Sequence, residues 1–151
     1  MEPVQSSDAL RLTGLTESQL REWCGRRGIF QPAVPARGPG RLALYSWQDI
    51  IALRILLEIF TTFGGKASGW AEGIKELRQQ IDRQFFPNLW GKFAIFADRN
   101  SAMLSTASQI SLPRAALIVP LDPHLVVLAD LSAPGDVQGQ LPLITTVGSL
   151  K

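Results

Sequence analysis

The feature that most constrains this chain is the long stretch Trp47–Phe63, in which nearly every side chain is apolar. Ser46 followed three residues later by Asp49 forms a capping box, which predicts that a helix begins here, and two glycines predict its end. A helix that is apolar on all sides must be buried on all sides. Arg54 and Glu58 interrupt the run, which is too short to cross a bilayer. We therefore expect a second domain, another subunit, or both to cover this helix.

Two short helices are predicted before this stretch, joined by a turn at Gly14. The first, Asp8–Thr13, is expected to end at this glycine. The second, Glu17–Arg27, begins with a capping box formed by Thr16 and Gln19. A short turn containing glycine between two short helices is the signature of a helix-turn-helix.

A stretch rich in proline and glycine, residues 32–45, links these helices to the long one. Its composition forbids a helix and favours a hairpin with its tip at 37–40. Arg37 and Arg41 flank the glycines at the tip. A flexible hairpin that carries arginines can lie along a phosphate backbone or enter a minor groove.

The remainder of the chain predicts one more helix and then a β-rich segment. The helix is expected over Gly69–Gln84, and the break after it suggests two domains, 1–86 and 87–151. The fold class is therefore α+β, a mostly helical N-terminal domain with a hairpin wing followed by a small β-rich domain. The expected strands are Lys92–Ala97, Ala102–Ala107, Ala115–Val119, Leu125–Leu131 and Leu143–Val147.

Positive charge is concentrated in the first part of the chain. Residues 1–92 carry 12 Lys and Arg against 9 Asp and Glu, a net charge of +3, whereas residues 93–151 carry 3 against 4, a net charge of −1. Between Arg11 and Arg41 there are 6 arginines and only 2 glutamates. A local basic excess attracts phosphate backbones, and a nearly neutral second half does not.

Short sequence pieces within residues 9–81 occur in an order and spacing typical of one family. In chain order they are Leu12-Thr13-Gly14-Leu15-Thr16, Leu20-Arg21-Glu22-Trp23, Gly28-Ile29-Phe30-Gln31-Pro32, Gly40-Arg41, Tyr45-Ser46 and Asp49-Ile50. Together they resemble the DNA-binding domain of MerR-type regulators, over about half of the chain. The resemblance implies a winged helix-turn-helix whose second helix enters the major groove while its wing touches the flanking backbone.

The resemblance also implies a set of DNA-contacting residues. In the second helix and at its start these are Thr16, Ser18, Arg21 and Glu22, and in the wing they are Arg37, Arg41 and Tyr45, whose ring braces the wing base and whose hydroxyl reaches a phosphate. Arg26 and Arg27 either contact DNA or interact with the dipole at the helix end. Glu22 either accepts from a cytosine or pairs with Arg26.

Three departures from the family pattern limit what can be transferred. Glu22 stands where the family has an aromatic residue, and residues 42–44 lengthen the wing. A proline-containing, β-rich segment replaces the long C-terminal helix through which such regulators form a coiled-coil dimer. The dimer geometry of the family is therefore not carried over to this chain.

The residue types that support catalysis or metal binding are sparse. The chain contains one cysteine, Cys24, and one histidine, His124, so they cannot form a His/Cys metal cluster within one chain. No phosphate-binding loop or nucleophile elbow is recognisable. Cys24 is either a packed residue or a redox sensor. We therefore expect no enzyme, no metal and no cofactor.

These observations predict a DNA-binding transcriptional regulator, with repression favoured over activation. The N-terminus lacks the pattern of a signal peptide, so a cytoplasmic location is expected, away from membranes. The expected partners are double-stranded DNA and a second copy of the chain, since the β-rich segment suits a dimerisation module, a sensing pocket or a docking surface for another protein. The alternatives are an architectural or partner-recruiting DNA binder, such as an excisionase or assembly factor, and an adaptor that retains only the fold.

Overall fold

A computed structural model describes residues 1–25, 29–37, 40 and 42–132. Within these residues the architecture is α+β, with five α-helices and one three-stranded antiparallel sheet. None of the described helices is both long and apolar enough to cross a membrane. The elements are α1 (Ser6–Thr13), α2 (Glu17–Cys24), α3 (Trp47–Phe63), α4 (Ala71–Asp82), β1 (Lys92–Asp98), β2 (Ser101–Thr106), β3 (Leu117–Pro120) and α5 (Asp122–Ser132), with short 3-10 turns at Ala67–Trp70, Phe86–Leu89 and Ala107–Gln109.

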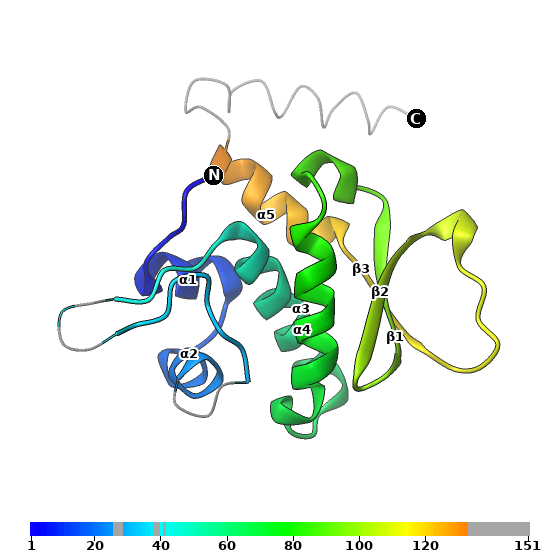
Figure 1. Cartoon of the computed structure of the whole chain (residues 1–151), viewed down its shortest axis with the longest axis horizontal. Coiled ribbons are helices and arrows are strands. Elements are labelled where there is room, and N and C mark those ends of the chain that lie inside the picture. Colours follow the sequence, from blue (N-terminus) through cyan, green and yellow to red (C-terminus); the bar gives the residue numbers. More distant parts are fainter. Residues whose placement is uncertain (26–28, 38–39, 41, 133–151) are drawn as a thin grey trace.

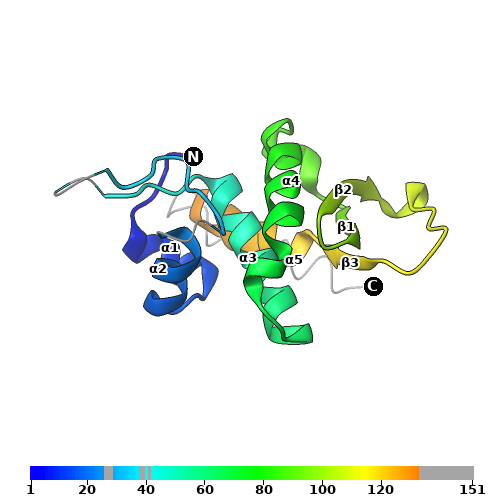
Figure 2. The same ribbon diagram turned by 60° about the horizontal axis from the view of Figure 1, so that its bottom comes forward.

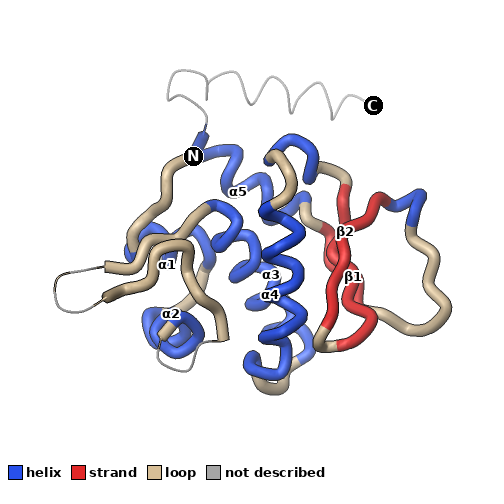
Figure 3. The backbone as a smooth tube through the Cα atoms, in the orientation of Figure 1, coloured by secondary structure: helices blue, strands red, loops and turns tan. Residues whose placement is uncertain are grey.

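The elements are arranged in order along the long axis of the molecule. Helices α1 and α2 and the loop 32–45 lie at one end, the sheet lies at the other, and α3 and α4 lie between them (Figures 1 and 2). Helix α5 follows the sheet in the chain but turns back towards α1 (Figure 3). The last described helix thus returns the chain to the side of the molecule that holds the N-terminal helices.

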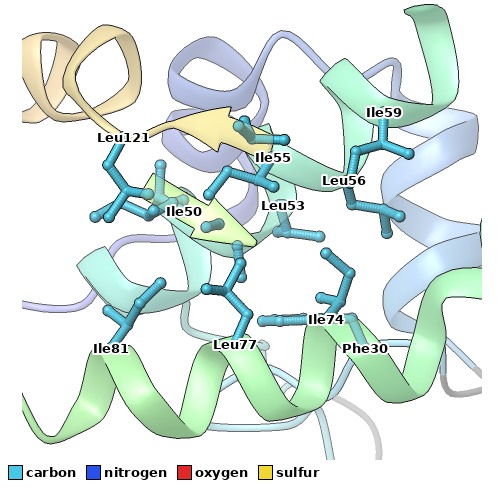
Figure 4. Close-up of a cluster of buried hydrophobic side chains, with 14 of the residues drawn as sticks. Phe30, Ile50, Leu53, Ile55, Leu56, Ile59, Ile74, Leu77, Ile81 and Leu121 are labelled. Atoms are coloured by element: carbon cyan, nitrogen blue, oxygen red, sulfur yellow. The ribbon is translucent and has the colours of Figure 1, made fainter. Parts of the chain in front are cut away.

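Helix α3 is the centre of the hydrophobic core. Leu53, Ile55 and Leu56 are fully buried, and the close-up in Figure 4 shows Leu53 directed towards Ile74 and Leu77 of α4. One connected cluster of buried apolar residues extends from α1 through α3 and α4 to the sheet and α5. Most of the apolar helix is therefore covered by elements of the same chain, chiefly α1 and α4, which belong to the predicted N-terminal domain, together with α5.

The sheet has the strand order β2-β1-β3, and α4 packs against its β1–β2 hairpin. Gly73 of α4 lies very close to the hairpin turn, where its backbone N–H donates to the Arg99 carbonyl oxygen at 3.1 Å. The approach is possible because glycine has no side chain. A Cβ atom at this position would lie only 2.6 Å from that oxygen. The Arg99 guanidinium also lies over the Trp70 ring, 5.6 Å from its centroid.

Segment Leu125–Leu131, predicted as a strand, is instead the larger part of helix α5. The neighbouring valines Val126 and Val127 favour a strand locally. The segment forms a helix despite this preference, because a helix places His124, Leu125 and Leu128 on one side, where they are buried as α5 packs against α3. Residues 87–132 therefore form three strands and a helix rather than a purely β segment.

The other predicted elements agree with the structure more closely. The strands expected near residues 92–97, 102–107 and 115–119 correspond to β1, β2 and β3. The expected helix Gly69–Gln84 divides into a 3-10 turn and α4. Helix α2 ends at Cys24 rather than at Arg27, and residues 26–28 lie outside the described residues, as does the expected strand Leu143–Val147.

Candidate nucleic-acid interface

Helices α1 and α2 are joined by a tight turn that local interactions define. Gly14 has φ 80°, the left-handed conformation that favours glycine, and its N–H donates to the Leu10 carbonyl oxygen at 3.0 Å. The capping box expected at the start of α2 is present. The Gln19 N–H donates to the Thr16 hydroxyl at 3.1 Å, and the Thr16 N–H donates to the Gln19 side chain at 3.0 Å. Because it caps the helix, the Thr16 hydroxyl is already engaged within the protein.

The outward side of α2 presents polar and charged side chains to solvent. Ser18, Arg21 and Glu22 are exposed, whereas Leu20 and Trp23 on the opposite side are buried in the core. The Arg21 guanidinium lies 3.1 Å from the Glu17 carboxylate, and both side chains are about three-quarters exposed. An exposed pair of this kind contributes at most about 1 kcal/mol, so Arg21 can leave it at little cost.

The loop 32–45 lies at the same end of the molecule as α2 (Figures 1 and 2). Val34 and Leu44 exchange two backbone hydrogen bonds, as a hairpin requires, and Tyr45 exchanges two with Val4. Arg37 is exposed near the tip. A groove of about 530 Å³ is lined by residues of α1, α2 and this loop, Arg21 among them.

Three of the predicted contact residues, Arg26, Arg27 and Arg41, lie outside the described residues. The structure therefore brings Arg21 and Arg37 to the same end of the molecule. It describes no position for the other three arginines.

The position of Tyr45 does not agree with the expectation that its hydroxyl reaches a phosphate. The residue is buried, and its hydroxyl lies close to Ser6 and Cys24, which both influence its pKa. Burial raises the pKa of the Tyr45 hydroxyl to about 12 and that of the Cys24 thiol to about 12. A thiol with such a pKa is protonated at neutral pH, which favours a packed Cys24 over a redox sensor. The backbone bonds of Tyr45 to Val4 suit a brace at the loop base.

Asp49 connects the loop to the helical core, a role beyond the capping box expected from sequence. Its fully buried carboxylate accepts from the Ala33 N–H at 2.7 Å and from the Ser46 N–H at 2.9 Å. The Arg78 Nε of α4 donates to the same carboxylate at 2.7 Å. One side chain thus fixes both arms of the loop, at Ala33 and at Ser46, relative to α3 and α4.

A second polar network, partly buried around His124 and missed by sequence reasoning, joins α1, α3 and α5. The Arg54 Nε donates to the His124 Nδ1 at 3.2 Å, and an Arg54 terminal nitrogen donates to the Leu12 carbonyl oxygen at 2.7 Å. The His124 Nε2 lies 3.0 Å from the Glu58 carboxylate. Since Nδ1 accepts from an arginine, the ring is neutral and Nε2 carries the proton. The sequence signal that could have predicted this network is the presence of two charged residues, Arg54 and Glu58, four residues apart in an otherwise apolar helix.

This network predicts a pH dependence of stability. Burial is the main cause that lowers the pKa of His124 below its usual value of about 6.5. Glu58 raises this pKa and the Arg54 charge lowers it, but the lowering by burial is the largest effect. Because the pKa of His124 is lower in the folded protein, its ring binds a proton at a higher pH in the unfolded chain than in the folded one. The contribution of the neutral ring to the free energy of unfolding is therefore complete above about pH 6.5 and is lost as the pH falls towards the folded-state pKa.

We expect the free energy of unfolding, measured by urea denaturation, to decrease between about pH 7 and about pH 5.5. The His124→Gln variant should show a flatter profile over the same range, because the chain has no other histidine. Parallel profiles for the two proteins would show that His124 does not cause the decrease.

No group of three or more His, Cys, Asp or Glu side chains that could hold a metal ion occurs within the described ranges. Both ring nitrogens of His124 are occupied by neighbouring side chains, so this residue has no free nitrogen for a ligand. No protein-family model matches this chain, and no curated protein matches it in sequence.

Proposed function

We propose that this chain is a double-stranded-DNA-binding transcriptional regulator rather than an enzyme. In this proposal α1, α2 and the loop 32–45 act as a winged helix-turn-helix, and two copies contact the two half-sites of a specific site. Helix α2 enters the major groove, which is wide enough for an α-helix, and the loop follows the flanking backbone. The observation that carries the proposal is the exposed side of α2, where Arg21 lies beside a loop that carries Arg37.

The proposed contacts divide into two classes. In this proposal the exposed side chains Ser18, Arg21 and Glu22 of α2 meet base edges or phosphates, and the exposed Arg37 of the loop meets a phosphate. Of the two directions of regulation we propose repression by occupation of the site. The described residues after α4 form a three-stranded sheet and the 11-residue helix α5 rather than the long dimerising helix of MerR-type regulators, on which activation in that family depends.

The pairing of Arg21 with Glu17 allows two variants with opposite expected effects on DNA affinity. Arg21→Ala removes a cation from the proposed face and is expected to weaken binding to duplex DNA about tenfold and to reduce the salt slope by about 1. Glu17→Gln removes a carboxylate that competes for Arg21 and repels phosphates, and it is expected to strengthen binding several-fold, on the order of 1 kcal/mol or less.

Fluorescence anisotropy with a labelled duplex measures both effects. Lys75→Ala is the matched control, because it removes an exposed cation from α4, away from the proposed face. The control should bind as the wild type does. Equal weakening by Arg21→Ala and Lys75→Ala would mean that general charge, rather than α2, attracts the DNA, and would contradict the proposed face.

A further inference from the structure

The C-terminal end of α1 is held by a side chain of α3. Leu12 is one of the last four residues of α1, whose carbonyl groups have no partner inside the helix. The Arg54 guanidinium donates to the Leu12 carbonyl oxygen at 2.7 Å, and a cation at this end of a helix also interacts favourably with the helix dipole. Gly14 follows at once and begins the turn into α2. Arg54 therefore fixes the end of α1 from which α2 is positioned.

His124 of α5 orients this guanidinium. The Arg54 Nε donates to the His124 Nδ1 at 3.2 Å, and the His124 Nε2 lies 3.0 Å from the Glu58 carboxylate. The His124 side chain is only 5% exposed. Among the described residues, the charges that act on the ring are those of Arg54 and Glu58, both on α3, while α1 contributes the uncharged Leu12 carbonyl to the network. The charge state of one ring therefore decides how Arg54 is held.

Protonation of His124 is incompatible with this arrangement. A proton on Nδ1 converts the acceptor of the Arg54 bond into a second donor and places a positive charge beside the guanidinium. The Glu58 carboxylate attracts the protonated ring through Nε2, so the group that has to move is the guanidinium. Because the same guanidinium donates to the Leu12 carbonyl oxygen, its movement also removes that contact from the end of α1.

We propose that Arg54 and His124 are positioning residues for the helix-turn-helix, and that protonation of His124 releases the end of α1 and lowers the affinity for duplex DNA. The inference rests on the proposed function. It goes beyond the loss of stability described above, because it concerns the folded protein and acts on α2 through the backbone of α1. Since the chain has no other histidine, this ring is the side chain expected to change its charge between about pH 5 and about pH 8.

Two NMR signals of the full chain and one binding measurement test the proposal. The ring signals of the single histidine give its titration midpoint, and the signal of the Leu12 carbonyl carbon, recorded without DNA, should change with the same midpoint. Fluorescence anisotropy with a labelled duplex at constant salt then gives the affinity about one pH unit above and below this midpoint. Acidification should weaken binding at least about fivefold, and by reciprocity bound duplex should lower the midpoint.

His124→Gln is the matched control. A glutamine side chain offers an acceptor to Arg54 and a donor to Glu58, as the neutral ring does, but it does not titrate. This variant should bind DNA equally well at both pH values, with an affinity close to that of the wild type above the midpoint. Circular dichroism at both pH values checks that the two proteins remain folded.

A Leu12 signal that does not follow the titration of the ring would overturn the proposal, as would a ring that stays neutral wherever the protein is folded. An equal affinity of the wild type on both sides of the midpoint, or an equal decrease for wild type and His124→Gln, would also overturn it. Absence of DNA binding at both pH values would contradict the proposed function and with it the effect on affinity, whereas the Leu12 signal tests the contact itself in either case.

Discussion

Replacing Asp49 by alanine is expected to lower the free energy of unfolding by about 3–5 kcal/mol, the usual effect of removing one partner from a buried ion pair. The Asp49 side chain is completely buried, and the Arg78 side chain that pairs with it is mostly buried. The substitution leaves the guanidinium without its inner partner. It also leaves the N–H groups of Ala33 and Ser46 without the acceptor that the structure gives them.

Asp82→Ala is the matched control for this prediction. Asp82 is the other carboxylate paired with Arg78, but it lies four residues away on the same helix and is half-exposed. Removing it is expected to cost less than about 1 kcal/mol. Urea denaturation of the three proteins measures the difference. Similar losses for both variants would show that burial does not distinguish the two carboxylates.

Leu53→Ala is expected to reduce the free energy of unfolding by about 2–5 kcal/mol, because it leaves a cavity inside a close-packed core. Leu53 is fully buried in the middle of α3, whose side chains meet those of α4 (Figure 4). The neighbouring helices cannot collapse into the space without separating from their other contacts.

Leu131→Ala removes the same side chain from an exposed position in α5 and provides the control. Its expected cost is below about 1 kcal/mol. Urea denaturation again gives both values. A loss below about 1 kcal/mol for Leu53→Ala would contradict the enclosure of α3 by the same chain.

The elements that could be predicted from sequence are those with strong local signals. The turn at Gly14 and the capping boxes that begin with Thr16 and Ser46 place α1, α2 and α3 near their observed positions. Local preference misled at α5, where two valines favour a strand and burial against α3 imposes a helix.

The contacts that fix the candidate site could not be predicted, because they join residues that are distant in the chain. Asp49 and Arg78 are 29 residues apart, and Arg54 and His124 are 70 apart. The sequence pattern predicts that Asp49 belongs to a capping box with Ser46, but it gives no indication that the carboxylate also pairs with Arg78. Similarly, the exposure of Arg21 follows from helical periodicity, whereas the burial of Tyr45 depends on how the loop closes on α1 and α2.

The most direct test of DNA binding is the affinity of the wild-type protein for a random duplex, measured by fluorescence anisotropy over a salt series. The account predicts binding at about 50 mM salt and a double-logarithmic slope steeper than about −2, since each neutralised phosphate contributes about −0.9. Absence of binding at about 50 mM salt, or an affinity that does not change with salt, would contradict a DNA-binding role for α2 and the loop 32–45.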